Sequence, residues 1–121
     1  MKGEERMKVS NLQAVRYLNT YDGILRKKRL PVKVIFALRH NYNLILNQQA
    51  KAYEEARKTL KEQCKDKNEF NNELDKLLGE DVEQPIKTIS FSEMEKMDEN
   101  ENYDSLTINE IEAIEFMLAE Q

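Results

Sequence analysis

The stretch from Val32 to Cys64 constrains the fold most, because it contains neither glycine nor further proline and repeats apolar residues at helical spacing. Pro31 precedes it in the first-turn position, where the missing N–H costs a helix nothing. Polar Gln49 interrupts the apolar stripe. One helix of this length would measure about 50 Å, against roughly 35 Å for a compact domain of this size. We therefore expect a helix that protrudes, bends or pairs along its far half.

Two capping patterns place helices on either side of this stretch. Ser10 and Gln13 have the spacing of a capping box, which predicts a helix over about 10–22 ending near Gly23. Asp66 and Glu69 repeat the pattern before an apolar stripe that ends at Gly79. The long helix and this later one are therefore expected to form an antiparallel hairpin with a tight turn near 64–67.

After Gly79 the apolar period changes from helical to alternating, which predicts one short edge strand over 82–90. A lone strand is marginal, so it needs a partner, either Met7–Val9 or a second molecule. A short helix is expected to begin at Ser92 and a final helix after Thr107. The sequence thus predicts a mostly α (α+β) fold, with a flexible extension over 1–6 and a single helical domain over 7–121.

Basic residues are concentrated in the first half of the chain and acidic residues in the second half. Residues 1–67 carry 16 Lys/Arg against 7 Asp/Glu, whereas residues 68–121 carry 3 against 16, so a net charge of −4 conceals a strong asymmetry. Such sorting indicates either that the halves neutralise each other in the fold or that each half attracts a different partner.

The sharpest local feature is a basic run before the long helix. Arg26, Lys27, Lys28 and Arg29 lie where the helix dipole disfavours cations, and Lys33 and Arg39 follow within the helix. Three interpretations remain open: docking against the acidic half, binding of an acidic protein, and binding of nucleic acid. The absence of an aromatic residue within the run weighs against a single-strand stacking platform.

The sequence predicts no catalytic, cofactor or metal site. His40 and Cys64 are the only histidine and cysteine, too few for a structural zinc, and a lone cysteine fits a reducing cytoplasm. The 98–104 segment alternates oxygen-bearing side chains like a calcium loop, but Tyr103 stands where that loop requires glycine. No apolar run is long enough for a membrane span.

Two stretches resemble a family of small proteins encoded by phages and prophages of Gram-positive bacteria. The first runs from Leu30-Pro-Val-Lys-Val-Ile-Phe-Ala-Leu38 to Ala52-Tyr-Glu-Glu-Ala-Arg57, and the second from Glu69-Phe-Asn-Asn-Glu-Leu74 to Ile114-Glu-Phe-Met117. That family has no assigned activity and no catalytic residues. The resemblance implies a viral accessory or assembly protein acting in a bacterial cytoplasm.

These observations favour a non-enzymatic, phage-derived module that binds a bacterial protein or complex, with inhibition of a host defence system as one possible role. We expect its contacts on the basic run and on acidic helix faces that include Glu73, Asp75, Glu110 and Glu112. Two alternatives stay open: a virion or assembly component that self-associates, and a weak nucleic-acid binder through residues 26–29.

Overall fold

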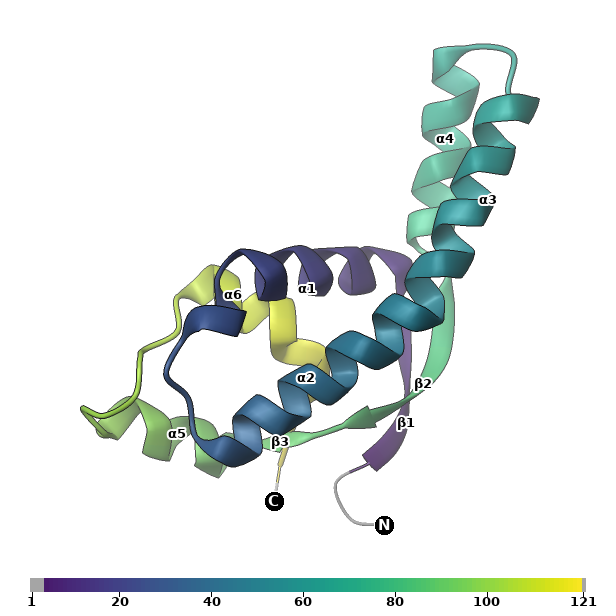
Figure 1. Ribbon diagram of the computed structural model, residues 1–121. Helices are drawn as coiled ribbons and strands as arrows, with labels where there is room; N and C mark the ends of the chain where they lie inside the picture. Colours follow the sequence, from purple (N-terminus) through teal and green to yellow (C-terminus); the bar gives the residue numbers. More distant parts are fainter. Residues whose placement is uncertain (1–3, 121) are drawn as a thin grey trace.

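A computed structural model describes residues 4–120 and shows a helical body from which a helix hairpin projects (Figure 1). The predicted mostly helical α+β fold is confirmed. In chain order the elements are β1 (Glu4–Ser10), α1 (Asn11–Gly23), η1 (Leu25–Lys27), α2 (Val32–Asn47), α3 (Gln49–Gln63), α4 (Lys67–Leu78), β2 (Asp81–Lys87), β3 (Ile89–Ser90), α5 (Phe91–Glu99), α6 (Ile108–Ile114), η2 (Glu115–Met117) and β4 (Leu118–Ala119).

The first helix begins where the capping box predicts. The Ser10 side chain accepts a hydrogen bond from the Gln13 backbone N–H, and the Gln13 side chain accepts one from the Ser10 N–H. These two bonds satisfy backbone donors that a helix start otherwise leaves unpaired. The helix ends at Gly23, one residue beyond the predicted end.

The predicted rod over 32–64 is two helices that bend at Gln48. The backbone of Gln48 departs from ideal helix geometry, with φ −118° and ψ −74°. Its N–H still donates to the carbonyl of Leu44, and its own carbonyl accepts from Ala52, so the hydrogen-bond ladder continues across the bend. The far half of the rod, α3, leaves the body and pairs with α4 (Figure 1).

The hairpin of α3 and α4 matches the prediction. Asp66 caps α4 by accepting a hydrogen bond from the Glu69 N–H at 2.9 Å, and the turn between the helices spans 64–66. The base of the hairpin is buried at Tyr53 and Leu77. Towards the tip the apolar residues between the helices, such as Leu60 and Phe70, stay partly exposed.

The two-stranded sheet corrects the expected N-terminal extension. β1 runs antiparallel to β2, with Glu4 opposite Lys87 and Ser10 opposite Asp81, so the fold includes Glu4–Arg6 rather than beginning at Met7. The reason is that a lone strand is unstable, and seven residues of β1 supply the backbone partners for all of β2. Residues 1–3 of the predicted extension lie outside the described residues.

The segment predicted as one strand over 82–90 is divided at Thr88. β2 pairs with β1, whereas β3 pairs in parallel with β4 at the end of the chain. The helix expected from Ser92 begins earlier, because Ser90 provides the cap by accepting from the Glu93 N–H. Thr107 caps α6 with a full capping box, as predicted.

One apolar core joins the helices of the body to the sheet. Tyr17 is fully buried and donates its hydroxyl to the carbonyl of Leu38, which ties α1 to α2, and burial raises its pKa. Asn41 hydrogen-bonds both the N–H and the carbonyl of Lys87, so its amide takes the place of a further strand residue. The main apolar side chains of this core are Val9, Tyr17, Leu25, Val34, Leu38, Ile45, Ile86, Ile89, Ile114 and Met117.

A buried group of amide side chains joins the hairpin to the body. We call Asn11, Gln49 and Gln84 the amide joint. The Gln49 amide donates to the carbonyl of Val9 at 2.8 Å and to the Asn11 side chain at 3.0 Å, and it accepts from Gln84 at 3.3 Å. Asn11 in turn donates to the carbonyl of Leu77 at the end of α4. Gln49, the polar residue that interrupts the apolar stripe, therefore forms the hydrogen bonds that fix where the hairpin leaves the body.

Replacing Gln49→Ala should lower the free energy of unfolding by about 2 kcal/mol, because it leaves buried partners of the amide without hydrogen bonds. Gln63→Ala, on the same helix but exposed, is the matched control and should change stability by less than about 0.5 kcal/mol. Urea unfolding of both variants measures the difference. Equal effects would show that the amide joint does not carry this stability.

Candidate functional site

The basic run over 26–29 folds against the acidic C-terminal part of the chain. Lys28 lies at its centre, and its ammonium group contacts the Glu110 carboxylate at 2.8 Å and donates to the carbonyl of Ser105 at 2.6 Å. Side-chain exposure is 14% for Lys28 and 6% for Glu110, so this ion pair is largely removed from solvent. A buried carboxylate of this kind requires its cation, because an unpaired charge at such a place is costly.

Arg29 joins the same contact through backbone and side chain together. Its N–H donates to Asp104 at 2.8 Å, its guanidinium contacts the same carboxylate at 3.0 Å, and its carbonyl accepts from the Asp104 N–H. The backbone and side-chain hydrogen bonds from Arg29 lower the pKa of Asp104. Residues 28–29 and 104–105 thus lie side by side in the fold.

Lys33 and Arg26 also have partners within the chain. The Lys33 ammonium lies 3.2 Å from Glu93 at the start of α5. Arg26 contacts Asp22 at 2.7 Å and lies over the rings of Tyr21 and Tyr42. Tyr42 donates to the same Asp22, and the hydrogen bonds from Arg26 and Tyr42 lower the pKa of that carboxyl.

Part of the basic region is thus paired within the chain, and its role as a partner surface stays a prediction. Lys28, Arg29 and Lys33 each pair with a carboxylate of the second half of the chain, which is the first of the three interpretations of the sequence. The physical reason is that these carboxylates compensate cations that the dipole of α2 disfavours. Lys27 and Arg39 remain exposed, but on their own they form no patch.

The acidic residues predicted as contacts are not one surface either. Glu110 is 4% exposed and is occupied by Lys28, so it is wrong as a partner contact. Glu73 is half-buried and pairs with Lys76 in α4. Asp75 and Glu112 are exposed, but α4 carries the first and α6 the second, and these helices belong to different parts of the molecule (Figure 1).

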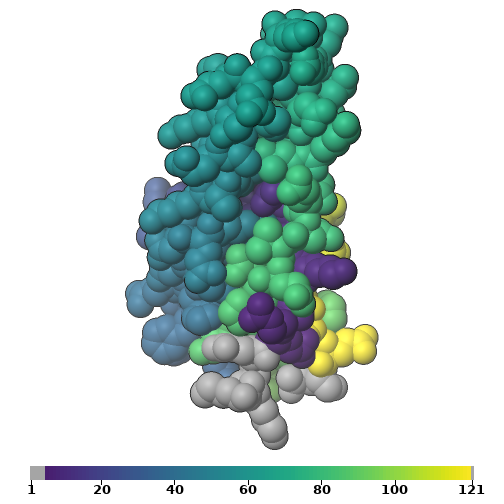
Figure 2. Space-filling view, turned by 90° about the vertical axis from the view of Figure 1, so that its right-hand side faces the viewer, coloured from purple at the N-terminus to yellow at the C-terminus, as the bar shows by residue number. Residues whose placement is uncertain are grey.

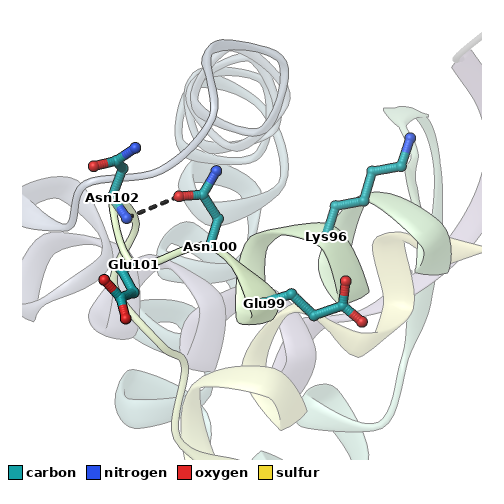
Figure 3. A pocket seen from close by; sticks show the side chains of 5 residues that line it. All are labelled: Lys96, Glu99, Asn100, Glu101 and Asn102. Carbon is teal, nitrogen blue, oxygen red and sulfur yellow. Dashed lines mark hydrogen bonds between the residues drawn. The ribbon is translucent and has the colours of Figure 1, made fainter.

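A shallow hollow of about 600 Å³ lies at the end of α5 and the following turn. Figure 3 shows that the side chains around it do not converge: Glu99, Glu101 and Lys96 point in different directions. The Asn100 side chain accepts from the Asn102 N–H at 2.9 Å and so belongs to the turn itself. With Asp104 held by Arg29, the oxygen-bearing residues of this segment do not form a cation site.

The tip of the hairpin carries a basic groove that the sequence analysis missed. A hollow of about 370 Å³ lies between the end of α3 and the start of α4, and we call it the tip groove. Its lining residues are Arg57, Lys61, Cys64, Lys65, Asp66, Lys67 and Phe70. The sequence does contain a signal for this groove, because Arg57 and Lys61 are spaced i and i+4 before the turn and Lys65 and Lys67 lie around it. These cations are more widely spaced than those of the basic run at 26–29 and are therefore less conspicuous in the sequence.

No metal centre is found within residues 4–120, where no three His, Cys, Asp or Glu side chains are grouped to hold an ion. Cys64 lies at the tip groove, where burial raises the pKa of its thiol and the carboxylates of Glu69 and Glu73 raise it further. A raised pKa keeps the thiol protonated and poorly nucleophilic. His40 lies on α2 in the body and is half-buried.

Lys28→Met should destabilise the protein by about 3 kcal/mol, since it leaves the Glu110 carboxylate buried without its cation. Lys27→Met, one residue away and exposed, is the matched control and should change stability by less than about 0.5 kcal/mol. Adding Glu110→Gln to Lys28→Met should recover part of the loss, because no buried charge remains. Urea unfolding of the three variants checks the order. A loss no greater for Lys28→Met than for Lys27→Met would contradict the contact.

Glu110 should also make stability depend on pH. Burial alone would raise the pKa of its carboxyl, but the hydrogen bonds from Lys28 and from the Thr107 backbone outweigh burial and lower it. A lowered pKa stabilises the fold above the unfolded-state value, and this contribution is lost as pH falls through the folded-state value. The stability difference between wild type and Glu110→Gln should therefore shrink as pH falls below about 4.5. Exposed Glu112→Gln is the control in thermal unfolding across pH, and an equal pH trend in both variants would exclude Glu110 as the cause.

No protein-family model, curated protein or solved structure matches this chain. Within residues 4–120, no helix combines the length and the apolar character needed to cross a membrane.

Proposed function

We propose that this protein is a non-enzymatic, phage-derived module that binds a bacterial protein or complex through its α3–α4 hairpin. The proposal keeps the function expected from the sequence but moves the binding surface. Arg26, Lys28 and Arg29 of the basic run form ion pairs within the chain, so the hairpin is the better candidate for contact with a partner.

The observation that carries this proposal is the projection of the hairpin from the body (Figures 1 and 2). Only its base is well buried, whereas the seam towards its tip stays partly exposed. Two helices that extend away from the core add polar surface and little burial of apolar area, so they contribute little to stability. A partner that packs against them would give this part of the chain a function.

The amide joint supports the proposal because it holds the hairpin in a fixed direction. Gln49 and Asn11 connect α3 and the end of α4 to β1 through buried hydrogen bonds. An element that is already ordered loses less conformational entropy when a partner binds. The hairpin is therefore suited to recognition of a surface.

The sites for chemistry that the sequence analysis considered do not assemble. Cys64 lies at the hairpin tip and His40 in the body, and the hollow at the end of α5 is open and shallow. The hollows described above lie at surface turns, whereas small-molecule sites are enclosed pockets with converging polar groups. These features support a contact with a macromolecule. The phage origin and the bacterial partner rest on the sequence resemblance alone, and inhibition of host defence stays a prediction.

The proposal is tested with a photo-crosslinking amino acid in place of Glu62 or Asn72, which are exposed on α3 and α4. Irradiation of Gram-positive cells that express either variant should give a covalent adduct with one and the same bacterial protein. The matched control is the same amino acid in place of Asn19, exposed on α1 of the body, and should give no such adduct. An adduct formed only from the Asn19 position would contradict the hairpin. An adduct with a second copy of the chain would favour the self-associating assembly component.

A further inference from the structure

The cations of the hairpin tip have no carboxylate partner among the described residues. In the body, Arg26, Lys28, Arg29 and Lys33 each form an ion pair. At the tip, none of Arg57, Lys61, Lys65 and Lys67 does so within residues 4–120. These four side chains lie around one hollow of about 370 Å³. Their charge is therefore available to a ligand.

Two carboxylates at the hairpin tip, Asp66 and Glu69, form hydrogen bonds within the hairpin itself. Asp66 accepts from the Glu69 N–H at 2.9 Å, and Glu69 accepts from the Lys65 N–H at 3.2 Å. Asp66 thus caps the start of α4, and both carboxylates lie near the helix N-terminus, where they interact favourably with the helix dipole. The caps leave the ammonium and guanidinium groups of the groove without a fixed counter-charge.

The tip groove also offers apolar surface. The ring of Phe70 lines it and is partly buried between the two helices, and the thiol of Cys64 lies beside it. The methylene groups of Lys61 and Arg57 add to this surface, because long basic side chains place their stems along apolar neighbours. The groove therefore combines cations at its edge with room for an apolar side chain.

We propose that the tip groove binds an acidic segment of a partner protein, in which carboxylates flank an apolar side chain. This inference rests on the proposed function and names the chemistry of the partner at that hairpin. The carboxylates would contact Lys61, Lys65 and their neighbours, and the apolar side chain would lie against Phe70. Charge complementarity of this kind speeds association and makes binding depend on salt.

Three features favour a protein segment over nucleic acid. Residues 57–70 carry five Lys/Arg against three Asp/Glu, so the tip as a whole has little excess charge for a continuous phosphate backbone. Phe70 is the single aromatic residue that lines the groove, whereas single-strand platforms stack successive bases on several aromatic side chains. The net charge of the whole chain is −4, which further disfavours a polyanion of high charge density.

The test uses the full chain and a fluorescein-labelled peptide of glutamates around a central phenylalanine, with binding followed by fluorescence anisotropy. Wild type should bind the peptide at about 50 mM salt and lose affinity as salt is raised. The double substitution Lys61→Glu with Lys65→Glu should weaken binding at least about tenfold. Replacing the central phenylalanine of the peptide by serine should also weaken binding.

The matched control is Lys51→Glu with Lys58→Glu, which makes the same change in net charge on α3 outside the groove lining. It should keep the affinity within about twofold. Circular dichroism and urea unfolding of both pairs establish that the hairpin is folded. Equal losses in the two pairs would overturn the groove as the site, and so would no binding to wild type.

Tighter binding of a labelled oligothymidine than of the peptide would overturn the protein segment in favour of nucleic acid. A salt-sensitive dimer in sedimentation, abolished by Lys61→Glu with Lys65→Glu, would instead identify a second copy as the occupant and overturn the proposal. If crosslinks from the Glu62 and Asn72 positions persisted in this double variant, the proposal that the tip groove binds an acidic segment would be overturned, but the proposed function would stand. If the wild-type hairpin gave no such crosslinks but still bound the peptide, the proposed function would be overturned and the acidic segment would stand.

Discussion

The amide joint is the interaction on which the arrangement of the two parts of the molecule depends. Gln49 begins α3, and its side chain turns inward to the carbonyl of Val9 in β1 and to Asn11 in α1. Asn11 reaches the end of α4 at the same place. Because these amides are buried, the hydrogen bonds they lose to water are replaced by one another and by the carbonyls of Val9 and Leu77. The amide joint therefore holds the hairpin in one direction relative to the body.

Contacts within the fold explain part of the uneven charge distribution along the chain. The basic run and the loop before α6 are distant in sequence, but Lys28 and Arg29 lie against Ser105, Asp104 and Glu110. This contact fastens the C-terminal segment to the start of α2. Three ion pairs, Lys28–Glu110, Arg29–Asp104 and Lys33–Glu93, join the basic first half of the chain to the acidic second half, so part of the charge asymmetry reflects long-range contacts within the fold.

The sequence predicted the elements well wherever the signal is local. The capping boxes at Ser10 and Thr107 gave correct helix starts, and the turn near 64–67 followed from spacing alone. A bend was expected but not placed at Gln48, because a helix period does not show which polar residue turns inward. The strand partner was expected at Met7–Val9 but not from Glu4, because an alternating pattern does not show where a distant partner strand begins. The site was harder for the same reason: Lys28 and Lys61 look alike in sequence, and only the fold distinguishes a paired cation from an unpaired one.

The pairing of β1 with β2 has a kinetic consequence. The two strands enclose α1 to α4, so Ser10 meets Asp81 only after the 70 intervening residues have been brought into place. The contact between α3 and α4, by contrast, joins neighbours across a short turn. Local pairings form early and long-range ones late. The hairpin is thus expected to exist on the folding pathway before the sheet closes, which exposes its seam to other chains while synthesis is being completed.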